Sequence, residues 1–147
     1  MALSLSRDLK NYIISQGIVS AIAGTCGTGG TTTITIHNGS IPANADAATN
    51  GTLLCVIENV GWGTTFGATS GTAALANTAG YTGTAATSGT AGWARITRIG
   101  TDYAGSAATF SLDGEVGTSA TSIFVINSVS IAAGGIVSLL TAPISLS

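Results

Sequence analysis

Charged side chains are scarce in this sequence of 147 residues, at 7%, whereas a typical soluble domain has about 25%. Four residues are Lys or Arg, and the formal net charge is −2. A surface that binds nucleic acid normally needs clustered cations to neutralise phosphates, so this composition argues against such a role. Two interpretations remain open: a compact domain with a neutral Ser/Thr surface, or a subunit whose faces are covered by its own copies or by a partner.

Long apolar runs, cysteine and histidine are also scarce. No stretch reaches the roughly 18 apolar residues of a membrane span, and no segment is typical of a targeting signal, so we expect no membrane partner. Two cysteines and one histidine do not make a convincing zinc site. Cys55 lies in an apolar run, which favours a buried free thiol. A disulfide between Cys26 and Cys55 is the alternative.

A catalytic constellation is missing as well. A nucleophilic triad needs a base and an orienting acid, and the sole histidine, His37, ends an expected strand. The segment 27–30, GTGG, lacks the Lys-Ser/Thr and the following helix of a phosphate-binding loop. Asp113 and Glu115 would share one face of a strand, as paired catalytic carboxylates can, but a solvated turn or a weak calcium-binding turn competes with that interpretation. We expect no enzyme activity, no cofactor and no metal site.

Glycine is abundant, with 21 residues, and Ala, Ser and Thr fill much of the remainder. Residues 5–16 have the three- and four-residue spacing of an amphipathic helix, which ends at Gly17. Alternating or β-branched segments predict strands over residues 31–37, 92–99, 107–113, 122–127 and 135–140. The apolar run 52–60 predicts a central strand buried on both faces. Turns are expected at 114–116 and 133–135.

Residues 61–92 repeat Gly-Thr-Ala and Ser-Gly-Thr without a fixed period. Because large apolar side chains are spread through this region, we expect a long loop region with one or two short strands rather than a structureless segment. Many short strands separated by turns predict a single β domain over residues 1–147. Its expected fold is all-β, an antiparallel β-sandwich or jelly-roll-like barrel with one short N-terminal helix, residues 1–17 forming a helical arm.

Five short motifs follow the expected helix and first strand. They are GSIPAN at 39–44, GTLL at 51–54, GTAGWARI at 89–96, GEVGTSA at 114–120 and IAAG at 131–134. Their order over nearly the whole chain resembles a family of small virion structural proteins of tailed bacteriophages. The sequence departs from that family at Thr121, where an acidic residue is common. This departure weakens the case for a metal or a charge pair at the turn.

The resemblance implies a protein of the virus particle that acts by binding alone. We expect a capsid cement or decoration protein on the outer capsid surface of the virion, which bridges and stabilises major capsid subunits. A homo-oligomer, with a trimer as the expected form, would repeat many weak contacts over the lattice and gain strength through avidity. The alternative is a tail, neck or fibre component, including a module that attaches to host carbohydrate.

Ten residues are candidates for contacts with partners: Leu5, Leu9, Tyr12, Ile13, Trp62, Phe66, Tyr81, Trp93, Arg95 and Arg98. The helix either packs on its own core or docks on a neighbouring subunit. The tryptophans either stack on sugars or anchor the core or a subunit contact. The two arginines fall on opposite faces of a strand, where one would pair with Asp113, with Glu115 or with an acidic patch on a capsid shell.

Overall fold

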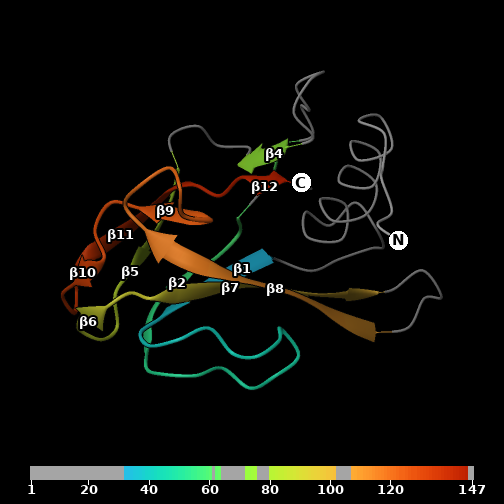
Figure 1. Ribbon diagram of the computed structural model, residues 1–147, viewed down its shortest axis with the longest axis horizontal. Coiled ribbons are helices and arrows are strands. Elements are labelled where there is room, and N and C mark those ends of the chain that lie inside the picture. The colour runs from blue at the N-terminus through green and yellow to red at the C-terminus, as the bar shows by residue number, and fades with distance from the viewer. Residues whose placement is uncertain (1–31, 61, 64–71, 76–79, 102–106, 146–147) are drawn as a thin grey trace, which may run out of the picture.

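The computed structural model describes residues 32–60, 62–63, 72–75, 80–101 and 107–145, and in Figure 1 these residues form strands and loops. The all-β class expected from the sequence is confirmed for this part of the chain. The expected N-terminal helix lies outside the described residues, as does Cys26.

Most of the strands are short. They are β1 (Thr32–His37), β2 (Leu53–Ile57), β3 (Trp62–Gly63), β4 (Thr72–Leu75), β5 (Tyr81–Thr84), β6 (Gly89–Thr90), β7 (Trp93–Thr101), β8 (Ala107–Gly117), β9 (Phe124–Ile126), β10 (Ser130–Ile131), β11 (Ile136–Thr141) and β12 (Ile144–Ser145). The expected strands near 31, 92, 122 and 135 are confirmed as β1, β7, β9 and β11. Region 61–92 holds β3, β4, β5 and β6, more strands than expected.

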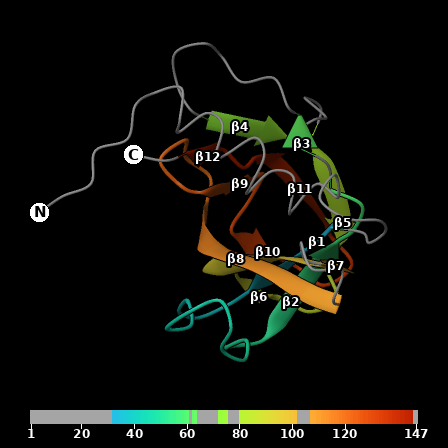
Figure 2. The same cartoon turned by 90° about the vertical axis from the view of Figure 1, so that its right-hand side faces the viewer.

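The main sheet has seven strands in the order β2-β1-β7-β8-β9-β11-β5, and it curls until its two end strands meet (Figure 2). A bridge between Cys55 and Ala85 joins β2 to the end of β5. The Ala86 amide also donates to the Leu54 carbonyl at 2.8 Å. At Gly83 a Cβ would lie 2.3 Å from the Val56 carbonyl oxygen, so only glycine permits this close approach. The result is a nearly closed barrel.

Two features complete the topology. The pairs in the main sheet are antiparallel except β8 with β9, which run parallel. The tight connection between them, residues 118–123, is held by the Ser122 amide donating to the Ser119 carbonyl at 3.0 Å. Smaller sheets, β10-β6 and β12-β4-β3, lie beside the barrel.

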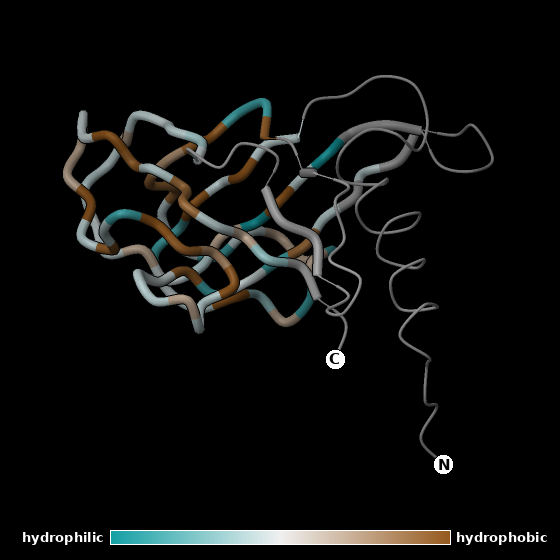
Figure 3. Tube along the Cα trace, turned by 90° about the horizontal axis from the view of Figure 1, so that it is seen from above, coloured by the Kyte–Doolittle hydropathy of each residue, from teal (hydrophilic) through white to brown (hydrophobic). Residues whose placement is uncertain are grey.

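The core fills the inside of the barrel because apolar residues alternate with polar ones along the strands (Figure 3). On β1 and β7, Ile34 pairs with Ile96 and Ile36 with Ala94, and all four side chains are at most 1% exposed. Burying each isoleucine contributes about 1.5–3 kcal/mol. Phe124, Ile126, Val137 and Leu139 meet them from the opposite side of the barrel. The alternate positions of β1 and β7 therefore face outward.

The turn expected at 114–116 is wrong, because β8 continues through it to Gly117. Gly114 serves packing rather than a turn: a Cβ there would lie 2.8 Å from side-chain atoms of both Ile123 and Phe124. Asp113 and Glu115 do share one face of a strand, opposite Arg95 and Trp93 of β7.

The expectation that the 52–60 run forms a central strand is also wrong in part. β2 is shorter than the run and ends the strand order, where it closes the barrel against β5. Leu54, Cys55 and Ile57 are buried, but Leu53 is 39% exposed. The apolar character of the run reflects this position in the closing seam rather than a position inside a flat sheet.

Cys55 carries a free thiol, and burial raises its pKa. Because the thiolate is the reactive form, we expect Cys55 to resist alkylation by iodoacetamide at pH 8 in the folded protein and to react fully in denaturant. Peptide mass spectrometry would measure alkylation at Cys55 separately from Cys26. Rapid alkylation of Cys55 under native conditions would contradict its burial in the closing seam.

Candidate functional site

The loop of residues 38–52 crosses the outward face of β1, β7 and β8, and its own side chains give it its shape. At the base, the side-chain carbonyl of Asn38 accepts from the Thr52 amide at 2.6 Å, and the Asn38 backbone amide donates to the Thr52 carbonyl at 3.1 Å. At the tip, Asn44 Oδ1 accepts from the Asp46 amide at 3.1 Å, which is an Asx turn. The loop is therefore tied at both places.

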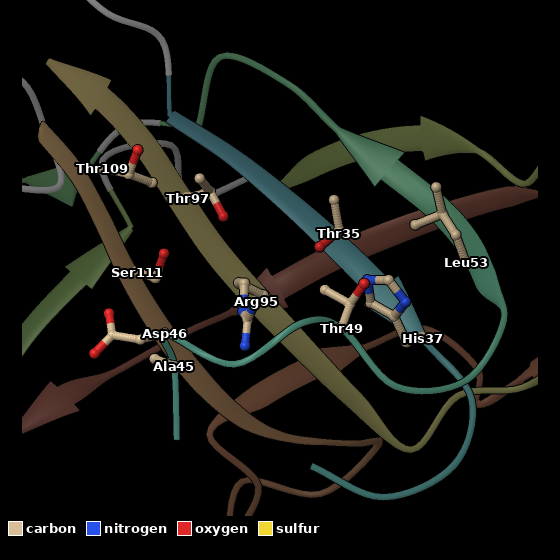
Figure 4. Close-up of a pocket in the computed structure, with 10 residues that line it drawn as sticks. All are labelled: Thr35, His37, Ala45, Asp46, Thr49, Leu53, Arg95, Thr97, Thr109 and Ser111. Atoms are coloured by element: carbon tan, nitrogen blue, oxygen red, sulfur yellow. The ribbon is translucent and has the colours of Figure 1, made fainter. Parts of the chain in front are cut away.

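A cavity of about 480 Å³ lies between this loop and the sheet, and we call it the hydroxyl trough. Its lining residues are Thr35, His37, Ala45, Asp46, Thr49, Leu53, Arg95, Thr97, Thr109 and Ser111. Figure 4 shows Thr97 and Thr109 toward one end, His37 and Leu53 toward the other, and Arg95 between them. Five of these residues carry hydroxyl groups, and they stand beside the charged residues Arg95 and Asp46 and the apolar Ala45 and Leu53.

Arg95 lies at the centre of the trough and donates three hydrogen bonds. Its Nε donates to Asp113 Oδ1 at 2.7 Å and its Nη2 to Asp113 Oδ2 at 2.8 Å, a bidentate pair. Its Nη1 donates to the Ala47 carbonyl at 2.8 Å, so the same side chain holds the loop to the sheet. The carboxylate of Asp113 raises the pKa of Arg95, and both side chains are at most 10% exposed. This buried ion pair therefore holds the guanidinium that binds the loop to the sheet.

His37 and Trp93 face each other across β1 and β7 and stack. Their ring centroids are 4.6 Å apart with 14° between the planes, and the Arg95 guanidinium carbon lies 5.6 Å from the Trp93 ring. His37 is 4% exposed and Trp93 is fully buried. Within the described part of the chain, neither His37 ring nitrogen has a hydrogen-bond partner. His37 therefore brings unused hydrogen-bonding capacity to one end of the trough.

Burial lowers the pKa of His37, and the positive charge of Arg95 lowers it further, while Asp113 opposes the shift. Between the folded and the unfolded pKa, His37 is therefore protonated in the unfolded chain but not in the folded chain. The free energy of unfolding falls as the pH drops below about 6.5, the pKa of an unfolded histidine, and levels off below the pKa of His37 in the folded chain. We expect urea midpoints measured between pH 7.5 and 5 to show this loss. In His37→Gln the loss should be smaller; an identical pH profile in that variant would contradict the assignment.

The ten candidate contact residues do not come together in the structure. Leu5, Leu9, Tyr12, Ile13 and Phe66 lie outside the described residues, and of Trp62 only the backbone in β3 is described. Tyr81 is partly buried against the core. Trp93, Arg95 and Arg98 are buried, at 0%, 8% and 1% exposure. Trp93 and Arg95 lie on the outward face of β7, with Arg95 lining the trough, whereas Arg98 lies on the opposite face with Ala94 and Ile96. Trp93 and Arg98 therefore offer no accessible surface to a partner.

Two sequence expectations about the arginines are confirmed. Arg95 and Arg98 fall on opposite faces of β7, since Arg95 lies opposite Thr35 and Arg98 opposite Thr32. Asp113 is the partner of Arg95 among the acidic groups that the sequence offered. Trp93 is fully buried on the outward face of β7, where it stacks on His37, so a sugar cannot stack on its ring.

Sequence reasoning missed the hydroxyls and the Ala47 carbonyl. The alternation of Thr35, Thr97, Thr109 and Ser111 with inward residues was a signal for an outward polar face, but threonine and serine are too common in this chain for it to stand out. Ala47 contributes only a backbone atom, which leaves no trace in the sequence.

In the described part of the chain, no group of three or more His, Cys, Asp or Glu side chains is placed to hold a metal ion. Nor does any described segment form a helix of the length and apolarity needed to cross a membrane. No protein family, curated protein or solved structure matches the chain.

Proposed function

We propose that this chain is a structural subunit of a bacteriophage particle, a capsid cement or decoration protein that bridges and stabilises neighbouring major capsid subunits. Its role is binding alone, without catalysis. The jelly-roll-like path of the strands, the N-terminal helical arm, the trimeric state and the position on the outer capsid surface belong to the same proposal. It rests on the ordered motifs of the sequence and on the surface of the barrel.

The observation that carries the proposal is the placement of the charges. Both cations in the described residues, Arg95 and Arg98, are buried. The exposed charged side chains there are the carboxylates Asp46, Glu58 and Glu115, which are spread over different elements. Such a surface can be covered by a basic partner, which would pair with the carboxylates, without burying an unpaired cation. This suits a subunit that remains in contact with other subunits.

Two of the motifs behind the phage resemblance, residues 39–44 and 89–96, contact each other in the structure. The Gly92 amide donates to the His37 carbonyl at 2.9 Å, and the Ala91 amide to the Val129 carbonyl at 2.8 Å. A Cβ at Gly92 would lie 2.3 Å from the Gly39 carbonyl oxygen, so two of the motifs touch through glycine backbone. Two sequence pieces that lie far apart along the chain thus share one structural role, which supports treating them together as a motif set.

The decisive experiment is a cryo-EM reconstruction of the intact particle that contains this chain. Density for the barrel across the boundaries between capsomers is the expected result, with basic capsid residues against Asp46, Glu58 or Glu115 wherever one of these carboxylates is covered. Density confined to the tail, the neck or the fibres would overturn the capsid proposal and favour the alternative location. Light scattering of the purified chain would test the trimer separately.

A further inference from the structure

The hydroxyl trough has the size of a small-molecule site and no role in the function proposed above. Its volume of about 480 Å³ falls within the range of roughly 300–1,000 Å³ that ligand pockets occupy. Its floor is a rigid sheet, because Thr35, Arg95 and Asp113 lie in register on β1, β7 and β8. Its roof is a loop tied down by Arg95 and Asn38. Such a cavity is formed before any ligand arrives.

The charges of the trough exclude anions as ligands. Its cation, Arg95, is already neutralised by two hydrogen bonds to Asp113, and a third hydrogen bond goes to Ala47. The remaining charged residue of the lining is Asp46, which is exposed and negative. A phosphate or carboxylate would meet no free positive charge and would be repelled by Asp46. The trough therefore favours an uncharged ligand.

The hydrogen-bonding groups of the trough suit a ligand that both donates and accepts at closely spaced positions. The hydroxyls of Thr35, Thr97 and Ser111 each offer one donor and two acceptor sites. Neighbouring hydroxyl groups on a sugar ring present this combination. His37 also lines the trough, but both of its ring nitrogens are buried, so a ligand would reach them only if the ring turned. Leu53 supplies an apolar patch at the same end (Figure 4).

We propose that the hydroxyl trough binds an uncharged carbohydrate of one or two sugar units. The site differs from the sugar contact that the sequence suggested, because it uses the hydroxyls of the sheet rather than an aromatic platform. Without a stacking ring, affinity depends on a few hydrogen bonds against the cost of association, so a Kd on the order of 1 mM is expected. The inference does not depend on where the chain sits in a particle.

The test is a titration of the ¹⁵N-labelled full chain followed by NMR, with glucose, galactose, N-acetylglucosamine, maltose and lactose as probes. Saturable shifts with at least one sugar are expected at the amides of Thr35, Ala47, Thr97 and Ser111. Glycerol controls for general polyol effects, and inorganic phosphate for an anion site. Failure of all five sugars to give saturable shifts there would overturn the proposal, as would equal shifts with glycerol or displacement of the sugar by phosphate.

Matched variants then assign the binding to the trough. Thr97→Val keeps the shape of the side chain and removes its hydroxyl, so it should weaken binding by about 2- to 10-fold. Thr84→Val is the control, because Thr84 is an exposed strand residue that does not line the trough. If Thr97→Val loses the folded spectrum, Ser111→Ala serves in its place. Equal weakening by Thr84→Val and by the trough variant would contradict the assignment.

Discussion

Replacing Asp113 by alanine is expected to lower the free energy of unfolding by about 3–5 kcal/mol. The reason is that Arg95, whose side chain is 10% exposed, would keep its charge without its bidentate partner. The cost is the desolvation of an unpaired guanidinium rather than the intrinsic worth of the pair. Urea denaturation at pH 7 measures it directly.

Two further variants separate this cause from general damage to β8. Glu115→Ala changes an exposed carboxylate two residues along the same strand, so it should alter stability by no more than about 0.5 kcal/mol. The double variant Arg95→Met/Asp113→Leu removes both charges and should recover much of the loss seen in Asp113→Ala. A double variant less stable than Asp113→Ala would mean that the attraction within the ion pair, together with the hydrogen bond to Ala47, outweighs the desolvation of the guanidinium.

Replacing Trp93 by alanine is expected to cost about 3–5 kcal/mol of unfolding free energy. The ring is fully buried beneath the loop, stacks on His37 and lies beside the Arg95 guanidinium. Its removal would leave a cavity where the loop meets the sheet. Trp93→Phe should cost less, because a smaller ring can still stack on His37. Thermal or chemical denaturation checks both values.

Ile136→Ala is the matched control for Trp93→Ala. Ile136 is a large apolar side chain in β11, but it is 60% exposed, so its truncation should change stability by about 0.5 kcal/mol or less. If Trp93→Ala were as mild as Ile136→Ala, the interior role of Trp93 would be refuted. Its function would then have to lie in contacts with another molecule, which is one of the roles that the sequence suggests.

Local sequence patterns predicted the strands that form the floor of the site. The β-branched run before His37 and the alternation from Trp93 onward gave β1 and β7, and they separated Arg95 from Arg98 correctly. These predictions succeeded because the period of a strand depends only on neighbouring residues. Because the sequence has few acidic residues, it offered few partners for Arg95. Asp113 was one of the partners named from the sequence, and the structure pairs it with Arg95.

The trough itself was beyond reach because its parts meet through tertiary pairing. Thr35, Arg95 and Asp113 lie side by side only once β1, β7 and β8 are in register, and no local pattern fixes that register. The error at Gly114 has the same origin. Glycine is needed there because the side chains of Ile123 and Phe124, on a neighbouring segment, leave no room for a Cβ atom. A sequence pattern alone assigns such a glycine to a turn.

The pairing of β1 with β7 has a consequence for how fast the protein can fold. β1 can first form a hairpin with the nearby β2, but its other edge must wait for a strand that is made of much later residues, such as Arg95 opposite Thr35. The chain between β1 and β7 must be ordered before their contacts form, and this ordering costs conformational entropy. Barrels with such long-range pairing are therefore among the slow folders. Until then the edge of β1 lies open to any other chain, so productive folding competes with association between nascent copies.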